Sequence, residues 1–344
     1  MVRMSDVARE AGVSPMTVSN VVNGRPGVKA ETRQRVLEAV ERLGYRPNAT
    51  ARLLRGGRSG AIGLLVPDVD TGYYAHLAAR LGAVAEAHGY HVVTERTGGT
   101  REGELGALYP ARVAAYDAIV MSPVVLDAGD LRAARIERPC VLLGERPLPG
   151  PFPHVMMDNI GGSMLATEHL LRAGARRIAL VGGRRAVAFG DMASLRSVGY
   201  RRAHGDAGIE VDDDLIVEVG SYSMRDGYDA VLALHAEQVD FDAAFVLTDA
   251  AAMGVLRALA DIGRRVPQDV QVVGFDNDAE ADFTIPRLTT VEPGNDAMAR
   301  EIVRLLLAQT GDGGRPPGPG DRVAEARLVV RESTLSARDV RSGR

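Results

Sequence analysis

The stretch from Val7 to Asn23, VAREAGVSPMTVSNVVN, constrains the fold of this chain most strongly. Gly12 permits a tight turn. Ser14 followed by Pro15 is a typical start for a second helix, because serine caps a helix N-terminus and proline suits the first helical position. The pattern therefore predicts a helix-turn-helix, a module that reads DNA with the start of its second helix. An ordinary helical hairpin in a bundle is the alternative.

The residues around this stretch make the DNA-binding interpretation more specific. Four segments follow one another in a recognisable order: DVAREAGVS at 6–14, TVSNVVNG at 17–24, ETRQRVLEAVERLGYRPN at 31–48 and ATARLLR at 49–55. In order and spacing these segments resemble the N-terminal part of the Lac repressor (LacI/GalR) family of bacterial transcription regulators. The resemblance implies an all-α DNA-binding head at residues 1–46.

The expected base contacts lie at the start of the second helix of this head. Pro15, Met16 and Asn20 match the positions that set base specificity in that family. Asn20 can pair with adenine through two hydrogen bonds, and Met16 can contact a thymine methyl group. Ser14 and Thr17 complete the DNA contacts that we expect from the head.

The distribution of charge agrees with a DNA-binding head. Residues 1–60 contain eleven Lys and Arg against five Asp and Glu, a net charge of +6. Because the whole chain carries −4, the remainder carries −10. A basic segment joined to an acidic body is typical of a module that binds a polyanion and is coupled to a domain with another task.

A hinge segment is expected at residues 47–60. A helix of about seven residues is marginal in water by itself. In the family this hinge helix pairs with its dimer mate in the minor groove of the operator, and the resemblance implies that Leu54 wedges into the central base step. The other expected DNA contacts of the segment are Asn48, Ala51, Arg52 and Arg55. A plain linker is the alternative.

From Ala61 onward, continuous apolar runs alternate with helical patterns. Strands are expected at AIGLLVP, HVVTE, AIVMS and CVLLG, and after Gly161 at IALVGG, LIVEV, AAFVLT, VQVVGFD and ARLVVRES. Such alternation predicts mainly parallel sheets with helices on both faces. Two such units in tandem give an α/β body of two lobes with a cleft between them.

The resemblance makes this body, residues 61–344, a periplasmic-binding-protein-like domain for effector binding and dimerisation. We expect an N-lobe at about 61–158 and 292–320, and a C-lobe at about 159–291 and 321–335. The resemblance also implies that the chain crosses between the lobes near Asp158, near Val291 and before Arg322.

Candidate effector contacts lie beyond the carboxyl ends of the predicted strands, where open α/β sheets bind ligands. The residues at such places are Asp68, Tyr73, Tyr74, Ser122, Asp249 and Asp276. The resemblance adds Arg196 and Tyr222, which match an effector-contacting arginine and aromatic residue in the family. Carboxylates and a guanidinium hold hydroxyl groups, and an aromatic ring stacks on a sugar or a base. The expected effector is therefore a sugar or a nucleoside. The alternatives are helix capping for Asp249 and lobe packing for the tyrosines.

No catalytic or metal-binding pattern is present in the sequence. There is no P-loop and no Gly-x-Ser-x-Gly elbow, and the seven histidines are scattered. We therefore expect no cofactor and no catalysis. The single Cys140 lies in an apolar run, which predicts a buried thiol. No run reaches the ~18 apolar residues of a membrane span, so we expect no membrane contact and a cytoplasmic, nucleoid-associated protein.

Together these features predict a repressor that binds a palindromic operator in double-stranded DNA as a homodimer, under the control of a small molecule. Two other classes of protein stay open. An enzyme with an accessory DNA-binding head would show turnover of a sugar or nucleoside. A stand-alone solute-binding protein fits less well, because the head is present and no apolar signal core precedes it.

Overall fold

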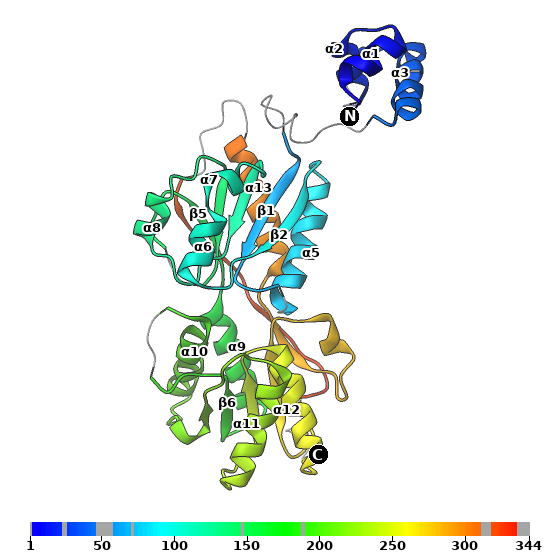
Figure 1. Ribbon diagram of the computed structural model, residues 1–344. Coiled ribbons are helices and arrows are strands. Elements are labelled where there is room, and N and C mark those ends of the chain that lie inside the picture. Colours follow the sequence, from blue (N-terminus) through cyan, green and yellow to red (C-terminus); the bar gives the residue numbers. More distant parts are fainter. Residues whose placement is uncertain are drawn as a thin grey trace. The chain divides into compact units, whose positions relative to one another are not determined.

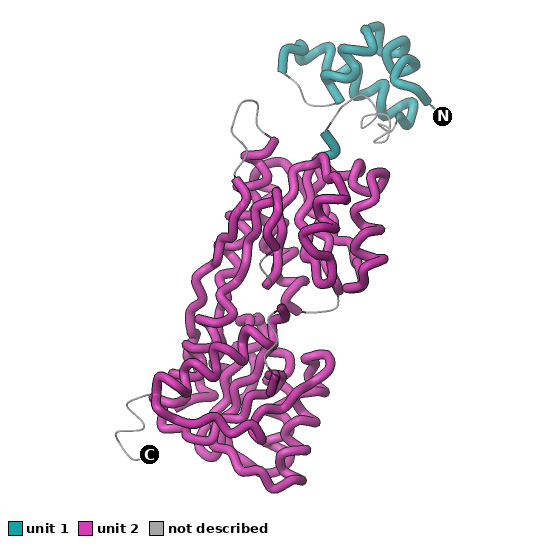
Figure 2. Tube along the Cα trace, turned by 90° about the vertical axis from the view of Figure 1, so that its left-hand side faces the viewer, with its two compact units in different colours: residues 1–59 teal, residues 60–344 magenta. Residues whose placement is uncertain are grey.

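The structure is a computed structural model that describes residues 2–22, 26–45, 58–69, 72–145, 148–186, 190–310 and 318–335. The chain divides into two compact units, Met1–Ser59 and Gly60–Arg344 (Figure 2). The expected hinge helix belongs to the end of the first unit. Its candidate DNA contacts lie outside the described residues: Asn48, Ala51, Arg52, Leu54 and Arg55.

The described part of the first unit is helical and comprises α1 (Met4–Ala11), α2 (Pro15–Val22) and α3 (Ala30–Leu43). Gly12 ends α1 with a φ of 63°, a left-handed conformation that glycine adopts without strain. Ser14 caps α2, since its Oγ accepts the backbone N–H of Thr17 at 3.1 Å. The predicted helix-turn-helix is therefore confirmed.

A small apolar core joins the three helices. Val7, Val18 and Val36, one from each helix, are completely buried. Burial of apolar surface is the main force that holds such a small bundle together. The core leaves the start of α2 accessible, and the side chain of Met16 is 68% exposed.

The start of α3 lacks a side-chain cap, because Lys29 at the N-cap makes no hydrogen bond to the first turn. We expect Lys29→Ser to stabilise α3 by about 1 kcal/mol, since a serine oxygen can accept one of the unpaired backbone N–H groups. Amide hydrogen exchange in α3 of the full-length protein should then slow about fivefold. Lys29→Ala removes the charge without adding a cap and should not slow it. Equal exchange in the serine and alanine variants would contradict the capping argument.

The strands of the second unit form two sheets, and the first belongs to the N-lobe (Figure 1). Its order is β11-β5-β4-β3-β1-β2, with parallel pairing throughout. Its strands are β1 (Ala61–Val66), β2 (His91–Arg96), β3 (Ala118–Met121), β4 (Cys140–Leu143), β5 (Pro153–Met157) and β11 (Gly320–Ala324). The N-lobe helices are α5 (Gly72–Glu86), α6 (Arg101–Ala107), α7 (Pro110–Val113), α8 (Ala128–Ala133) and α13 (Asn295–Thr310).

The second sheet belongs to the C-lobe and has the order β12-β10-β9-β8-β6-β7. Only the β10–β12 pair is antiparallel among the described strands. The strands are β6 (Ile178–Val181), β7 (Ile216–Val217), β8 (Ala243–Val246), β9 (Gln271–Phe275), β10 (Thr289–Glu292) and β12 (Arg327–Val329). The helices are α9 (Asn159–Arg172), α10 (Met192–Asp206), α11 (Met224–Ala236) and α12 (Asp249–Asp261), with short 3-10 turns η1 (Asp213–Leu215) and η2 (Ala279–Asp282).

The predicted α/β architecture of two lobes is confirmed, but the third crossing between the lobes was predicted at the wrong place. We expected it before Arg322. Strand β11 pairs with β5 from Gly320 to Ala324, so the chain crosses only between Ala324 and Arg327. The error has a physical reason, because β11 is a half-exposed edge strand whose polar residues resemble a loop.

Helices α11 and α12 pack through a pair of glycines. A Cβ on Gly227 of α11 would lie 1.9 Å from the carbonyl oxygen of Ala251. A Cβ on Gly254 of α12 would lie 1.8 Å from the carbonyl oxygen of Met224. Neither position can accept a methyl group unless the backbone moves, so the close approach of the two helices depends on both glycines.

Candidate functional site

A buried arginine lies at the centre of the polar residues of the second unit. Arg196 of α10 is 2% exposed, and its guanidinium carbon lies 3.4 Å from the centroid of the Phe275 ring. Its Nε donates to Asn159 Oδ1 at 2.8 Å, and its Nη2 pairs with Asp276 Oδ1 at 3.5 Å. Its Nη1 donates to the carbonyl oxygen of Leu247. These contacts fix the plane of the guanidinium and give its N–H groups the hydrogen-bond partners that a buried arginine needs.

Asp276 occupies a strained position directly after β9. Its φ is 112°, which residues with a Cβ rarely adopt, and its backbone N–H donates to the carbonyl oxygen of Val291 at 2.9 Å. Burial raises the pKa of Asp276 to about 8, although Arg196 opposes the shift. Strain and a shifted pKa at a strand end are typical of a ligand-binding position.

The raised pKa of Asp276 predicts a pH-dependent stability. The folded chain holds this proton more tightly than the unfolded chain, so the free energy of unfolding should fall as the pH rises from about 4 to about 8. Asp276→Asn removes this titration. As the pH rises from about 6 to about 8, the free energy of unfolding of the wild type, measured in urea, should fall by about 2 kcal/mol more than that of the variant. Parallel pH profiles would mean that Asp276 is ionised throughout this range.

Tyr73 of α5, in the N-lobe, lies near Arg196 and Asp276. Its hydroxyl interacts electrostatically with Glu145 after β4, with Asp276 and with Arg196. Burial raises the pKa of Tyr73, so its hydroxyl stays protonated at neutral pH and can both donate and accept a hydrogen bond. Side chains from both lobes therefore lie near enough to influence one another's charge.

A pocket between the lobes lies beside these groups. Its lining residues are Tyr74, Ser122, Pro123, Val124, Gly144 and Glu145 of the N-lobe, and Gly190 and Asp191 of the C-lobe. The hydroxyl groups of Tyr74 and Ser122 share a hydrogen bond of 3.0 Å. Burial raises the pKa of Glu145, although Arg196 opposes the shift. The pocket thus offers hydroxyl and carboxylate groups to a polar ligand.

Tyr222 approaches the same groups from the C-lobe. Its hydroxyl accepts a hydrogen bond from Arg184 at 3.2 Å and interacts electrostatically with Glu145 and Arg196. Of the eight predicted effector contacts, Tyr74 and Ser122 line the pocket. Four more interact electrostatically with Glu145 in its lining: Tyr73, Arg196, Tyr222 and Asp276.

The structure places Asp249 away from the pocket lining. Asp249 is completely buried, and its carboxylate accepts hydrogen bonds from Thr290 Oγ1 at 2.6 Å and from the backbone N–H of Asp278 at 2.8 Å. The side chain of Thr248 caps α12, so the capping alternative for Asp249 is wrong. Asp278 in turn pairs with His76 of the N-lobe at 2.8 Å. Asp249 therefore fixes the C-lobe segment after β9, which contacts the N-lobe through Asp278.

Asp68 also lies outside the lining of this pocket in the described part of the chain. It follows β1, and its carboxylate pairs with Arg96 at the end of β2, with a shortest distance of 3.3 Å. Both side chains are exposed to solvent, so this ion pair contributes little to stability.

Two acidic residues of this region were not predicted from the sequence. Glu145 follows β4, and the rule that ligands bind beyond strand ends could have identified it. Glu104 of α6 is completely buried, and its carboxylate accepts the backbone N–H groups of Val124 at 2.7 Å and Leu126 at 3.0 Å. Glu104 thereby fixes the segment after β3 that lines the pocket. No sequence signal marks it, because a glutamate in a short helix resembles a solvated residue.

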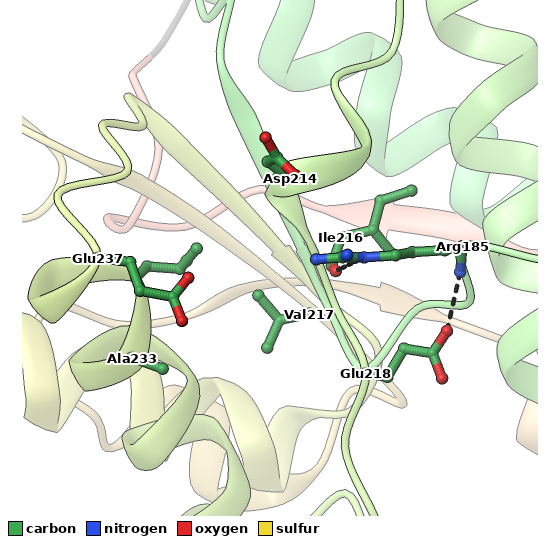
Figure 3. A pocket seen from close by; sticks show the side chains of 8 residues that line it. Arg185, Asp214, Ile216, Val217, Glu218, Ala233 and Glu237 are labelled. Atoms are coloured by element: carbon green, nitrogen blue, oxygen red, sulfur yellow. Dashed lines mark hydrogen bonds between the residues drawn. The ribbon is translucent and has the colours of Figure 1, made fainter.

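A second pocket opens at the edge of the C-lobe sheet, beside β7 and the end of α11 (Figure 3). Its lining residues are Arg185, Asp214, Ile216, Val217, Glu218, Ala233, Leu234 and Glu237. The backbone N–H of Arg185 donates to Glu218 at 3.1 Å, and its Nε donates to the carbonyl oxygen of Ile216 at 3.2 Å. None of the predicted effector contacts lines this pocket, so it is separate from the pocket between the lobes.

In the described part of the first unit, five candidate DNA contacts lie on and beside one helix, α2. Ser14, Pro15 and Met16 are exposed, and Thr17 and Asn20 are half-buried. Ser14 and Thr17 are also joined by a hydrogen bond of 3.0 Å between their side-chain oxygens. The helix start is therefore both rigid and accessible, as base reading requires.

Comparison with known proteins shows the family. Residues 3–48 match the family model described as bacterial regulatory proteins, lacI family, and residues 167–334 match that of a periplasmic binding protein-like domain. Catabolite control protein A of Priestia megaterium is 36% identical over 306 residues, which cover 89% of this chain and 91% of that protein. The chain belongs to the lacI family.

Solved structures of other proteins are also similar to this lacI-family chain. The Lac repressor dimer bound to operator and the anti-inducer ONPF superposes with a TM-score of 0.81, at 28% identity over 97% of this chain and 99% of that chain. The complex of the regulator CelR with cellobiose gives a TM-score of 0.67, at 32% identity over 97% of this chain and 100% of that chain. The lacI-family chain is thus a DNA-binding transcription regulator and not an enzyme.

The described residues of this lacI-family regulator contain no group of three His, Cys, Asp or Glu side chains placed to hold a metal ion. Among those same residues, every helix is too short or too polar to span a bilayer. Cys140 is buried, as predicted.

Proposed function

We propose that this regulator is a repressor that binds a palindromic operator as a homodimer and responds to a small molecule between its lobes. The observation that carries the proposal is the convergence of Tyr73 from the N-lobe with Arg196 and Asp276 from the C-lobe. A ligand held by both lobes favours one arrangement of the lobes over another, and such a difference in affinity is what allosteric control requires. The site of action is the DNA of the cytoplasmic nucleoid.

We infer that the effector is a saccharide in contact with the converging side chains. Hydroxyl groups match the carboxylates and the guanidinium, and a sugar ring can stack on a tyrosine. The cellobiose bound by the related CelR favours a saccharide over a nucleoside. The proposed contacts are Tyr73, Tyr74, Ser122, Glu145, Arg196, Tyr222 and Asp276. Asp249 acts through Thr290 and Asp278, and Asp68 belongs to the outer part of the site.

The proposed DNA contacts divide into two groups. Pro15, Met16 and Asn20 read base edges in the major groove, with Ser14 and Thr17 beside them. Leu54 wedges into the minor groove, and its neighbours in the hinge hold the backbone. The exposure of Met16 and the net charge of +6 over residues 1–60 support this assignment. The neighbours of Leu54 in this proposal are Asn48, Ala51, Arg52 and Arg55.

Selection of bound sequences from a random DNA pool by the full-length protein tests the DNA-binding part. A two-fold symmetric consensus is expected. Asn20→Ala should change the preferred base at one position of each half-site, because it removes a base contact. Arg225→Ala, an exposed change in the other unit, should leave the consensus unaltered. Enrichment of an asymmetric sequence would contradict a dimer, and no enrichment would contradict specific DNA reading.

Two exposed apolar side chains support the proposed homodimer. Phe283 is 85% exposed and Ile285 is 96% exposed, both just after η2 in the C-lobe. Large apolar side chains in contact with water are typical of an interaction surface, and a symmetric dimer buries the same patch on both copies. The double change of Phe283 and Ile285 to Asp should convert the dimer to a monomer in analytical ultracentrifugation. Val323→Asp, on the N-lobe edge strand β11, is the control and should stay dimeric. A double variant that stays dimeric would place the interface elsewhere.

A further inference from the structure

We propose that the pocket between the lobes selects a saccharide that carries no negative charge, and that Glu145 is the residue that excludes anionic ligands. The inference rests on the proposed function, because it concerns the same pocket. It goes beyond that function by separating free sugars from sugar phosphates.

Acidic groups dominate the described surroundings of the pocket. Glu145 and Asp191 line it directly. The nearest cation to Asp191 in the described ion pairs is Arg184, at 3.7 Å, and Arg184 is also shared with Glu218 at 3.6 Å. The charge of Arg184 is therefore already matched by two carboxylates.

Arg196 is similarly occupied and cannot serve as a free anion receptor. Asp276 lies 3.5 Å from its Nη2, which also donates to the sulfur of Met157 at 3.3 Å. Its Nε donates to Asn159, and its Nη1 donates to Leu247. A phosphate prefers a guanidinium that presents two free, parallel N–H groups. Only the second N–H of Nη1 has no partner among the described residues, so Arg196 can offer a ligand one hydrogen bond but not the parallel pair that binds a phosphate.

Glu145 adds a carboxyl group for which the described residues show no ion pair. Burial raises its pKa, and the opposing effects come from Arg196 and from a backbone hydrogen bond donated by Met192. A phosphate near Glu145 would meet repulsion that solvent screens only weakly in a partly buried site. A hydroxyl group instead donates a hydrogen bond to the same carboxylate. The paired hydroxyls of Tyr74 and Ser122 extend this preference for uncharged polar groups along the wall of the pocket.

Titration calorimetry with matched pairs of sugars tests the inference. The pairs are D-glucose with glucose 6-phosphate, D-ribose with ribose 5-phosphate, and maltose and cellobiose with their 6′-phosphates. Wild-type protein should bind at least one free sugar, and its phosphate should bind about 100-fold more weakly, because like charges in a site cost several kcal/mol. Glu145→Gln keeps the shape and removes the charge, so this ratio should shrink about tenfold or more.

Asp214→Asn is the matched control. It removes one negative charge in the separate pocket beside β7, and so it should leave the ratio unchanged. A cooperative thermal unfolding curve checks that each variant is folded. A sugar phosphate that binds wild-type protein as tightly as its free sugar would overturn the proposed selectivity. The same ratio in Glu145→Gln and wild type would overturn the role of Glu145.

Absence of binding by every sugar in both forms would overturn the saccharide class. Operator binding, measured with the same samples, separates this failure from failure of the proposed function. Protein that selects a symmetric operator but binds no saccharide keeps the DNA-binding role and loses only the effector class. Protein that does neither contradicts the proposed function as a whole.

Discussion

Replacement of Arg196 by leucine should lower the free energy of unfolding by about 3–5 kcal/mol and abolish the response to the effector. The guanidinium is 2% exposed, and it holds Asp276, Asn159 and Leu247 from three separate segments of the second unit. Removal of one partner leaves the other polar groups buried without their hydrogen bonds, which costs far more than the net value of the pair. Urea unfolding of the full-length protein measures the loss.

The control for this prediction is Arg225→Leu. Arg225 also pairs with an aspartate, Asp229, but its side chain is 78% exposed. Its replacement should therefore alter the free energy of unfolding by less than about 0.5 kcal/mol. The double change of Arg196 and Asp276 to leucine should recover part of the loss, since it leaves no unpaired carboxyl group. If Arg196→Leu lowered the free energy of unfolding by less than about 1 kcal/mol, water would have to replace the lost contacts.

Gly254→Ala should destabilise the C-lobe by about 3 kcal/mol, at the upper end of the usual range for overpacking. The new methyl group would lie 1.8 Å from the carbonyl oxygen of Met224, so α11 and α12 would have to separate. In an unconstrained helix the same substitution is favourable, because alanine loses less backbone entropy than glycine.

Gly205→Ala in α10 provides that comparison. No heavy atom lies within 4 Å of its added Cβ, so this variant should be more stable by about 0.5–1 kcal/mol. Thermal and urea unfolding of both variants give the contrast. If Gly254→Ala were also stabilising, the two helices would have to tolerate separation at no cost, and the packing argument would be wrong.

The helix-turn-helix could be predicted from sequence because its signals are local. Gly12 ends one helix, Ser14 caps the next, and both act within a few residues of chain. The buried strands of the second unit could be predicted for a similar reason. Strands such as β1 and β8 are covered on both faces, and so they are continuous apolar runs.

The remaining features depend on contacts between distant residues. Strand β5 pairs with β11 more than 150 positions later in the chain, and neither strand has a pattern that shows its partner. The role of Asp249 depends on Thr290 and Asp278, and only the folded structure shows that these groups meet. Six candidate effector residues were identified by their place at strand ends, and Arg196 and Tyr222 by the family resemblance. Which of the eight lie close together depends on how the lobes meet.

The three crossings between the lobes restrict how the lobes can move. The chain passes from one sheet to the other after Met157, after Glu292 and after Ala324. Parallel tethers of this kind resist sliding and permit mainly rotation about a common hinge, and a few residues at the ends of elements absorb the change. The C-lobe has no covalent connection to the head except through these tethers and the N-lobe, whose first strand begins at Ala61. In the proposed allosteric control, a ligand would therefore act within one chain by rotating the C-lobe against the N-lobe, which is covalently joined to the DNA-binding segment.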